Sequence, residues 1–196
     1  MRPVLILTTA LLVLAGLAGC NKATDHACEK VSAPITDIAP ATTDAVRLGV
    51  PVPQDWERNT KLDTALVRFA MANPKLAQDG FKPNAVVTAE VIPHGVGKSG
   101  EILDEQRKQL ETQLGARDIT PTPGSHCGYP SETITYTTPP RGRIPTRYST
   151  VLCVVAEAAG NAYLITVTVG TVDPKNETFQ RDSDEIRKGF TVAPGH

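Results

Sequence analysis

The chain lacks any block of like charge and is poor in aromatic residues. Its 196 residues include 20 Lys and Arg against 21 Asp and Glu, with one Trp, four Tyr and four Phe. Nucleic-acid binding requires a clustered basic face, and electrostatic attachment to a membrane requires a polybasic patch. The even charge balance disfavours both, and we expect no nucleic acid among the partners.

A long hydrophobic run occurs only at the N-terminus. Arg2 precedes an apolar stretch from Val4 to Leu17, which leads into the sequence Leu17-Ala18-Gly19-Cys20. A stable transmembrane helix needs roughly 20 apolar residues, so this stretch is too short to span a bilayer. A basic start, a short apolar run and small residues before a cysteine are typical of a bacterial lipoprotein signal peptide.

This lipobox predicts that residues 1–19 are removed and that Cys20 becomes the first mature residue, lipidated on its sulfur and its amine. A single acyl chain binds membranes with an association constant of only about 10⁴ M⁻¹, so we expect the multi-acylated form. The protein is therefore predicted to be extracytoplasmic and anchored to the cell membrane through Cys20.

The segment after the lipobox predicts a tether. Residues 20–44 are mostly small or polar, with prolines at Pro34 and Pro40. Such a composition need not pack and gives a flexible linker. The mature chain is long enough for one domain, and we predict a single globular domain over residues 45–196.

The cysteine count leaves an odd number after Cys20 is assigned to the lipid. Cys28, Cys127 and Cys153 remain, which in an exported protein indicates one disulfide and one thiol, or three thiols. Cys127 lies shortly before a predicted strand and Cys153 lies within the next one, so a hairpin of the two could make them near neighbours. We predict the disulfide Cys127–Cys153, while Cys28 in the tether could pair with either.

Hydrophobic periodicity predicts an α+β domain with an antiparallel sheet flanked by helices. The apolar residues of 100–114 fall four apart, with Ser99 as the expected cap and Gly115 as the expected end, and a last helix is expected over 176–188. A tight turn at 159–161 indicates a hairpin. Strands are expected over residues 46–50, 65–70, 84–93, 133–137, 148–158 and 162–169, with 190–192 as a short apolar lid.

Three short stretches resemble one known family. Residues 50–56 (Val-Pro-Val-Pro-Gln-Asp-Trp) are similar to the Pro-x-x-Trp segment of the LpqN-type lipoproteins of mycobacteria and their relatives. Residues 163–169 resemble the late hydrophobic strand of that family, and residues 184–192 resemble its closing helix and Gly-Phe-x-Val segment. The resemblance implies a PsbP-like α/β/α sandwich and an accessory role in the cell envelope. It implies no catalytic residues.

The sequence contains no recognisable catalytic or metal-binding constellation. A metal site needs three or four convergent ligands, whereas His94 and His126 share no such spacing and are expected to be exposed. The stretch Gly97-Lys98-Ser99-Gly100 lacks the second spacing of a G-x-S-x-G nucleophile elbow. We therefore predict a protein that is not an enzyme and has neither a metal nor another cofactor.

Three residues stand out as candidates for ligand or partner contacts. Trp56 lies in an expected turn, and Trp is frequent at binding anchors, although packing on the sheet edge is the simpler role. Arg141 and Arg143 flank Gly142 in a proline-rich loop. Two guanidinium groups on a rigid loop could bind an anionic lipid headgroup or an acidic partner, although a soluble loop tip needs no such role.

These observations favour a non-enzymatic, membrane-anchored envelope lipoprotein that binds a partner protein or an envelope component, and we expect it to be a monomer. One alternative is a carrier of lipids or small amphiphiles, with an apolar cavity between the sheet and the helix at 100–114. Another is an envelope hydrolase. An enclosed apolar cavity would favour the carrier, and convergent titratable groups in a cleft would favour the hydrolase.

Overall fold

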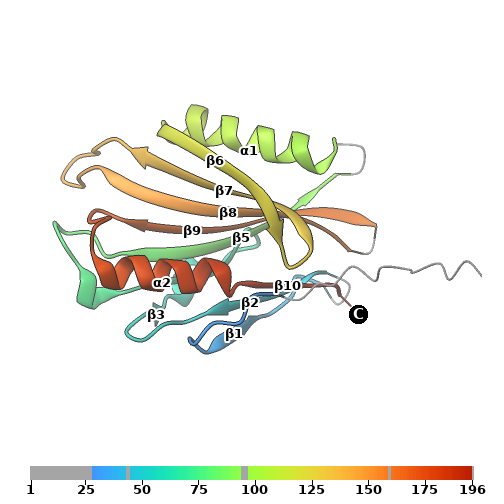
Figure 1. The fold of residues 1–196 in the computed structure, drawn as a ribbon, viewed down its shortest axis with the longest axis horizontal. Helices are drawn as coiled ribbons and strands as arrows, with labels where there is room; N and C mark the ends of the chain where they lie inside the picture. The colour runs from blue at the N-terminus through green and yellow to red at the C-terminus, as the bar shows by residue number, and fades with distance from the viewer. Residues whose placement is uncertain (1–27, 43–44, 94–96, 159, 196) are drawn as a thin grey trace, which may run out of the picture.

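A computed structural model describes residues 28–42, 45–93, 97–158 and 160–195, and these residues form two antiparallel sheets and two α-helices (Figure 1). The larger sheet has the strand order β3-β4-β5-β9-β8-β7-β6, and the smaller one the order β1-β2-β10. Cys20 and the predicted signal peptide lie outside the described residues.

The larger sheet consists of β3 (Glu57–Arg58), β4 (Val67–Ala72), β5 (Asn84–Ile92), β6 (Arg117–His126), β7 (Tyr129–Thr138), β8 (Arg147–Ala158) and β9 (Asn161–Thr171). The smaller sheet consists of β1 (Ile35–Ile38), β2 (Arg47–Pro51) and β10 (Thr191–Ala193).

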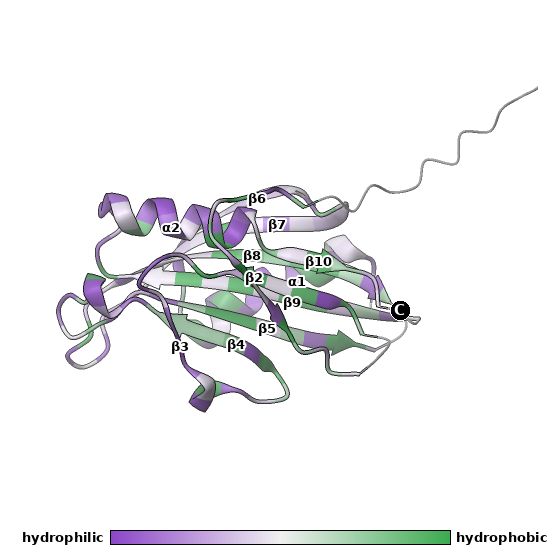
Figure 2. Cartoon of the chain, turned by 90° about the horizontal axis from the view of Figure 1, so that it is seen from below, coloured by the Kyte–Doolittle hydropathy of each residue, from purple (hydrophilic) through white to green (hydrophobic). Residues whose placement is uncertain are grey.

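The larger sheet is covered on both faces. Helix α1 (Ser99–Leu114) packs on one face, and α2 (Glu177–Lys188) lies on the other together with the smaller sheet (Figure 1). Successive side chains of a strand point to opposite faces, so Val151 and Cys153 of β8 face α1 while Leu152 and Val154 face the α2 side. The predicted α+β class and α/β/α layering are confirmed. In Figure 2, much of the hydrophobic colour of the described residues lies on the central strands.

Local sequence explains the ends of the helices. The carboxylate of Glu101 accepts a hydrogen bond from the backbone N–H of Lys98 at 3.1 Å, and Gly115 ends α1 with a φ of 66° that favours glycine. Lys98 is the N-cap, so Ser99 is the first helical residue rather than the expected cap. The Asn176 side chain caps α2 by accepting from the Phe179 N–H at 3.0 Å. Among the described residues, no helix is long and apolar enough to cross a membrane.

Part of the predicted tether belongs to the folded domain. Strand β1 lies within residues 20–44 and pairs with β2 over four residues, from Ile35 opposite Pro51 to Ile38 opposite Leu48. The predicted boundary at residue 45 is therefore too late. The expected lid at 190–192 overlaps β10, which pairs with the other edge of β2.

The predicted disulfide Cys127–Cys153 is wrong. The structure joins Cys127 to Cys28, and Cys153 is a buried free thiol. Cys153 faces α1, whereas Cys127 lies in the two-residue turn between β6 and β7 and packs with the core on the opposite face of the sheet. The alternation of side chains along the strands keeps the two sulfur atoms on different sides.

Candidate functional site

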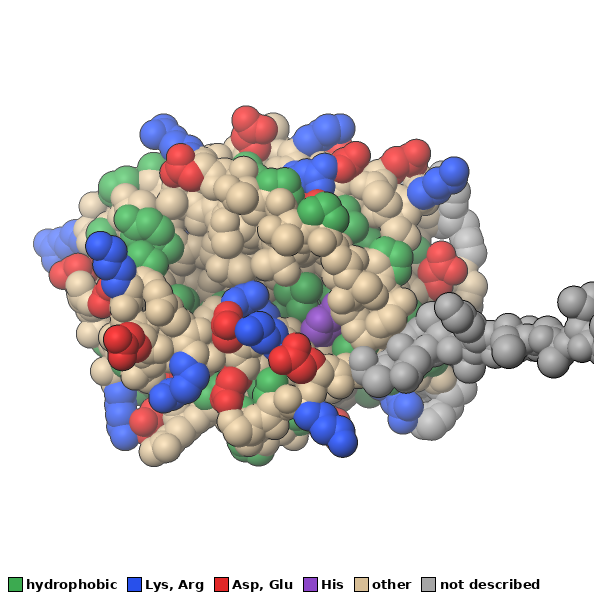
Figure 3. All heavy atoms as spheres, viewed as in Figure 1, with side chains coloured by type: hydrophobic (Ala, Val, Ile, Leu, Met, Phe, Trp, Pro, Cys, Tyr) green, Lys and Arg blue, Asp and Glu red, His purple; other side chains and the backbone are tan. Residues whose placement is uncertain are grey.

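An open cleft of about 720 Å³ lies between α2 and the part of the larger sheet that α2 leaves uncovered. Strands β7 and β8 form its floor, and α2 forms one wall. Figure 3 shows this side of the molecule hollowed between the charged side chains of α2 and the strands above it. A second open pocket, lined in part by Trp56 and Phe69, has a similar volume of about 710 Å³.

Hydroxyl-bearing side chains make up the floor of the cleft. Thr135 and Thr137 of β7 lie opposite Thr150 and Tyr148 of β8, so all four point to the same face of the sheet. The Thr137 hydroxyl donates to the Asp118 carboxylate at 2.8 Å, and Tyr148 is 40% exposed. This floor offers hydrogen-bond donors and acceptors beside one accessible aromatic ring.

The wall formed by α2 is charged. Gln180, Arg181, Asp184 and Arg187 recur at three- and four-residue spacings, so they lie along one side of the helix. Arg187 is ion-paired with Asp184, which also binds Lys188 Nζ at 2.9 Å. Burial lowers the pKa of the Arg187 guanidinium, and the nearby Asp184 carboxylate opposes that shift. The wall can therefore present both a cation and an anion to a ligand.

Trp56 does not belong to the exposed surface of this site. It is only 5% exposed, and its indole Nε1–H donates to Asp182 Oδ2 at 2.9 Å. Asp182 is buried on the inner side of α2 and also binds Arg181 Nη2 at 2.8 Å. Trp56 thus fixes α2 against the core, and its selection as an exposed contact residue was wrong.

The two loop arginines are exposed but do not line the cleft. Arg141 and Arg143 lie in the β7–β8 loop, where backbone hydrogen bonds join Arg141 and Ile144 and Gly142 has a φ of 62°. The loop connects the two strands of the cleft floor, so the arginines lie beyond one end of the cleft.

His126 is half-buried, contrary to the expectation of an exposed side chain. Its Nε2–H donates to the Phe190 carbonyl at 2.7 Å, and its ring stacks on the Phe190 ring. Burial lowers the pKa of His126, while the hydrogen bond to Phe190 opposes that effect. Its place at the last position of β6, a strand that the sequence did not predict, explains why it was missed.

The space between α1 and the sheet is filled by side chains. Ile102, Leu103 and Leu110 are buried against Ile134 and Val151. The hollow beside α1, about 550 Å³, is open to solvent, and polar side chains of the helix such as Glu105 and Gln106 line it together with apolar residues such as Ile92 and Leu164. The residues of the larger cleft include neither histidine nor cysteine. Within the described ranges, no three His, Cys, Asp or Glu side chains lie close enough to hold a metal ion.

Comparisons with known proteins give one family and two structures. The family model Lpp-LpqN, described as "Probable lipoprotein LpqN", matches residues 29–193. A crystal structure of LpqN from Mycobacterium tuberculosis, a protein described as involved in cell envelope biogenesis, aligns with a TM-score of 0.65 at 14% identity, covering 82% of this chain and 91% of that one. The Ran-binding protein Mog1p of Saccharomyces cerevisiae aligns with a TM-score of 0.48 at 10% identity, covering 82% and 96% of the two chains. No curated protein sequence matches the chain.

Proposed function

The chain belongs to the Lpp-LpqN family of lipoproteins, and on this premise we propose that it is a non-enzymatic accessory protein of cell-envelope biogenesis. Cys20 anchors it to the membrane, and the cleft between α2 and the sheet binds a partner protein or another envelope component. The envelope role extends to this chain the description of its structural relative LpqN.

The open cleft is the observation that carries the proposal. Its floor supplies hydroxyl groups and the Tyr148 ring, and its wall supplies Arg187 and Asp184. These groups can recognise a ligand by hydrogen bonds, charge and aromatic contact. The cleft is already open, so binding requires no movement of the core. Such a site suits a polar or mixed surface better than a bare acyl chain.

The two alternatives find less support in the described residues. A lipid carrier would need an enclosed apolar cavity, whereas the space beneath α1 is packed with Ile102 and Leu110. A hydrolase would need a nucleophile activated by a base, and the hydroxyl that meets a carboxylate in the cleft, Thr137 beside Asp118, has no histidine among the cleft residues to relay its proton.

The loop arginines extend the proposed site. Arg141 and Arg143 lie between the two strands of the cleft floor, so a partner that fills the cleft and carries acidic groups can reach both. Replacing both by alanine is expected to weaken such a complex without changing the affinity of a neutral ligand.

Site-specific photo-crosslinking in the native envelope tests the proposal. A photoreactive phenylalanine analogue at Thr135, an exposed position of the cleft floor, is expected to crosslink one defined partner or envelope component. The matched control places the analogue at Gln113, an exposed position on α1. Thr135→Arg, which fills the cleft with a charged side chain, should abolish recovery of the same species by an analogue at Tyr148. Equal crosslinking from Thr135 and Gln113 would contradict the assignment of the cleft.

A further inference from the structure

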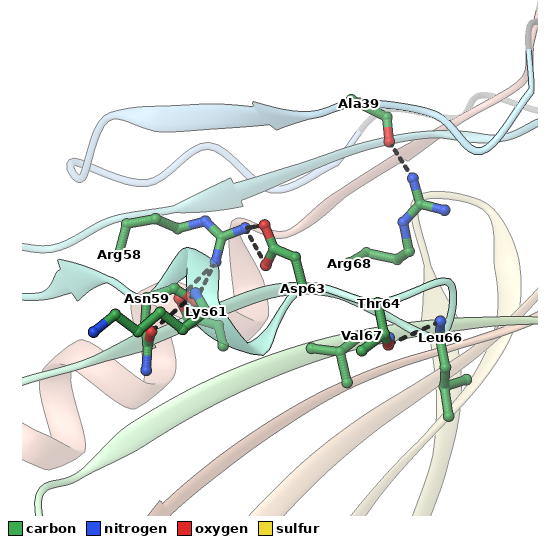
Figure 4. A network of polar contacts seen from close by, with 10 residues as sticks. Ala39, Arg58, Asn59, Lys61, Asp63, Thr64, Leu66, Val67 and Arg68 are labelled. Atoms are coloured by element: carbon green, nitrogen blue, oxygen red, sulfur yellow. Dashed lines mark hydrogen bonds and ion pairs between the residues drawn. The ribbon is translucent and has the colours of Figure 1, made fainter.

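Two exposed apolar side chains lie together at one end of the larger sheet. Val91 is 53% exposed near the end of β5, and Leu66 is 49% exposed just before β4. The Ala89 N–H donates to the Leu66 carbonyl at 3.1 Å, which holds the two strands together at this point. The Thr64 hydroxyl accepts from the backbone N–H groups of Leu66 and Val67 at 3.2 and 2.9 Å (Figure 4). Leu66 is therefore held on a fixed turn.

A shallow hollow of about 260 Å³ adjoins these side chains. Its lining includes Ala39, Pro40 and Ala41, the exposed residues that follow β1. Arg68 Nη2 donates to the Ala39 carbonyl at 2.6 Å and ties this segment to β4 (Figure 4). We call the surface made by Ala39, Pro40, Ala41, Leu66 and Val91 the apolar end surface.

The strand register places the disulfide at this same end. Val91 lies opposite Tyr163, and Tyr163 lies opposite Ala156. Ser131 of β7 lies opposite Val154, so Tyr129 continues the row of Ala156. Strands are spaced about 4.8 Å apart, which puts Val91 about 14 Å from Tyr129 across three spacings. Cys127, bonded to Cys28, is two residues before Tyr129.

The disulfide fixes how far the domain can move from the lipid. Seven residues separate Cys20 from Cys28. Even fully extended, this connection spans at most about 29 Å. The 12 residues of β8 alone span about 40 Å, so the far end of the sheet lies beyond that reach while the end bearing the disulfide stays within it.

We propose that the apolar end surface docks on the lipid surface of the membrane that holds the acyl chains of Cys20. This inference rests on the lipid attachment proposed above. Contact with the bilayer interface removes Leu66 and Val91 from water, which is favourable. The short connection to Cys28 keeps the surface at a high effective concentration beside the membrane, so the contact forms even where it would be weak in a free protein. The cleft floor near Tyr148 lies toward the opposite end of β8, which this orientation places away from the bilayer.

Tryptophan quenching by brominated lipid tests this orientation. The mature lipidated chain, with Leu66→Trp or Val91→Trp, is reconstituted in vesicles of dibromophosphatidylcholine and compared with unbrominated vesicles. We expect bromine-dependent loss of fluorescence at both positions. The matched control is Leu114→Trp. Leu114 is 52% exposed at the C-terminal end of α1, and we expect no bromine-dependent loss of fluorescence there. Trp56 is buried and contributes the same background to all three variants.

The disulfide provides a second arm of the test. In the double variant Cys28→Ser, Cys127→Ser, circular dichroism first verifies the fold, and the quenching at residue 66 is then expected to decrease because the fixed attachment point is lost. Vesicle-bound protein whose quenching is the same at residues 66 and 114 would overturn the docking while leaving the proposed function intact. A mature chain whose mass shows no acyl groups would overturn the docking together with the proposed anchor.

Discussion

The two faces of the larger sheet are covered in different ways. On the α1 face, Ile102, Leu103 and Leu110 close the space against the strands, and Arg107 Nη1 lies 2.6 Å from both carboxylate oxygens of the buried Glu132. On the other face, α2 covers only part of the sheet and leaves Thr135 exposed in the cleft.

The two faces also differ in which parts of the chain hold them together. The α1 face joins α1 to strands that follow it closely in sequence. The α2 face is joined by contacts between distant segments, namely the Cys28–Cys127 disulfide and the bond from Trp56 to Asp182, 126 residues apart. The stability of the α2 face thus depends on these cross-links and on the core behind them.

Loss of the disulfide should have the largest effect. The Cys28–Cys127 bond closes a loop with a sequence separation of 99, and its removal by Cys28→Ser, Cys127→Ser should lower the free energy of unfolding by about 4 kcal/mol. Urea denaturation measures the change. Cys153→Ala leaves the disulfide intact and should cost only about 1 kcal/mol. Equal losses in the two variants, or a peptide map that links Cys127 to Cys153, would contradict the pairing.

On the α1 face, the buried ion pair is the sensitive point. Arg107→Ala leaves the Glu132 carboxylate, 3% exposed, without its bidentate partner and should cost about 3 kcal/mol in the free energy of unfolding. The double variant Arg107→Leu, Glu132→Leu removes both charges and should recover most of that stability. Crosslinking from Thr135 should be unchanged in both variants. A double variant no more stable than Arg107→Ala would argue against an unpaired charge as the cause.

Much of the fold could be predicted because its central elements have strong periodicity. The segments at 84–93, 148–158, 100–114 and 176–188 all match observed elements closely. Strand β6 was missed because Pro121, Pro123 and Gly124 are poor strand formers, which an edge strand tolerates. Strand β1 was missed because it is short and lies between Pro34 and Pro40.

The site was harder to predict than the fold. The alternation of Thr with Ile and Tyr in β7 predicts a strand but does not show that its threonines form a site. These hydroxyl groups are accessible only because α2 covers part of that face of the sheet. Nothing in the sequence indicated that Trp56 would hydrogen-bond to Asp182, which lies 126 residues later in the chain. The disulfide error could have been noticed from the sequence pattern. Side chains alternate along β8, so Cys153 and Leu152 point to opposite faces of the sheet.

A smaller effect is expected at the bond between Trp56 and α2. Trp56→Phe removes the donor to Asp182 and leaves this buried carboxylate with one partner fewer, which should cost about 2 kcal/mol in the free energy of unfolding. Asp182→Asn retains an acceptor for the indole N–H and should cost less. Thermal unfolding of the two variants measures the difference. If Asp182→Asn were the more damaging, the ion pair with Arg181 rather than the indole bond would be the main contact.

At neutral pH the ionisation of the Cys153 thiol has the smallest effect on stability, and it is the finest test of the closed face. Burial, assisted by the nearby Glu132, raises its pKa to about 12. An ordinary thiol ionises near pH 9 in the unfolded chain, so the unfolded state loses its proton first as pH rises, and stability declines between pH 9 and pH 12. Cys153→Ala should remove that part of the decline.

Iodoacetamide should label native Cys153 slowly at pH 9, with a rate still rising toward pH 11, because only the thiolate reacts. A cysteine introduced by Tyr148→Cys, in the open cleft, should react quickly, with a rate that is half-maximal near pH 9 and levels off about one pH unit higher. Similar rates at the two positions would mean that α1 does not close its face more tightly than α2 does.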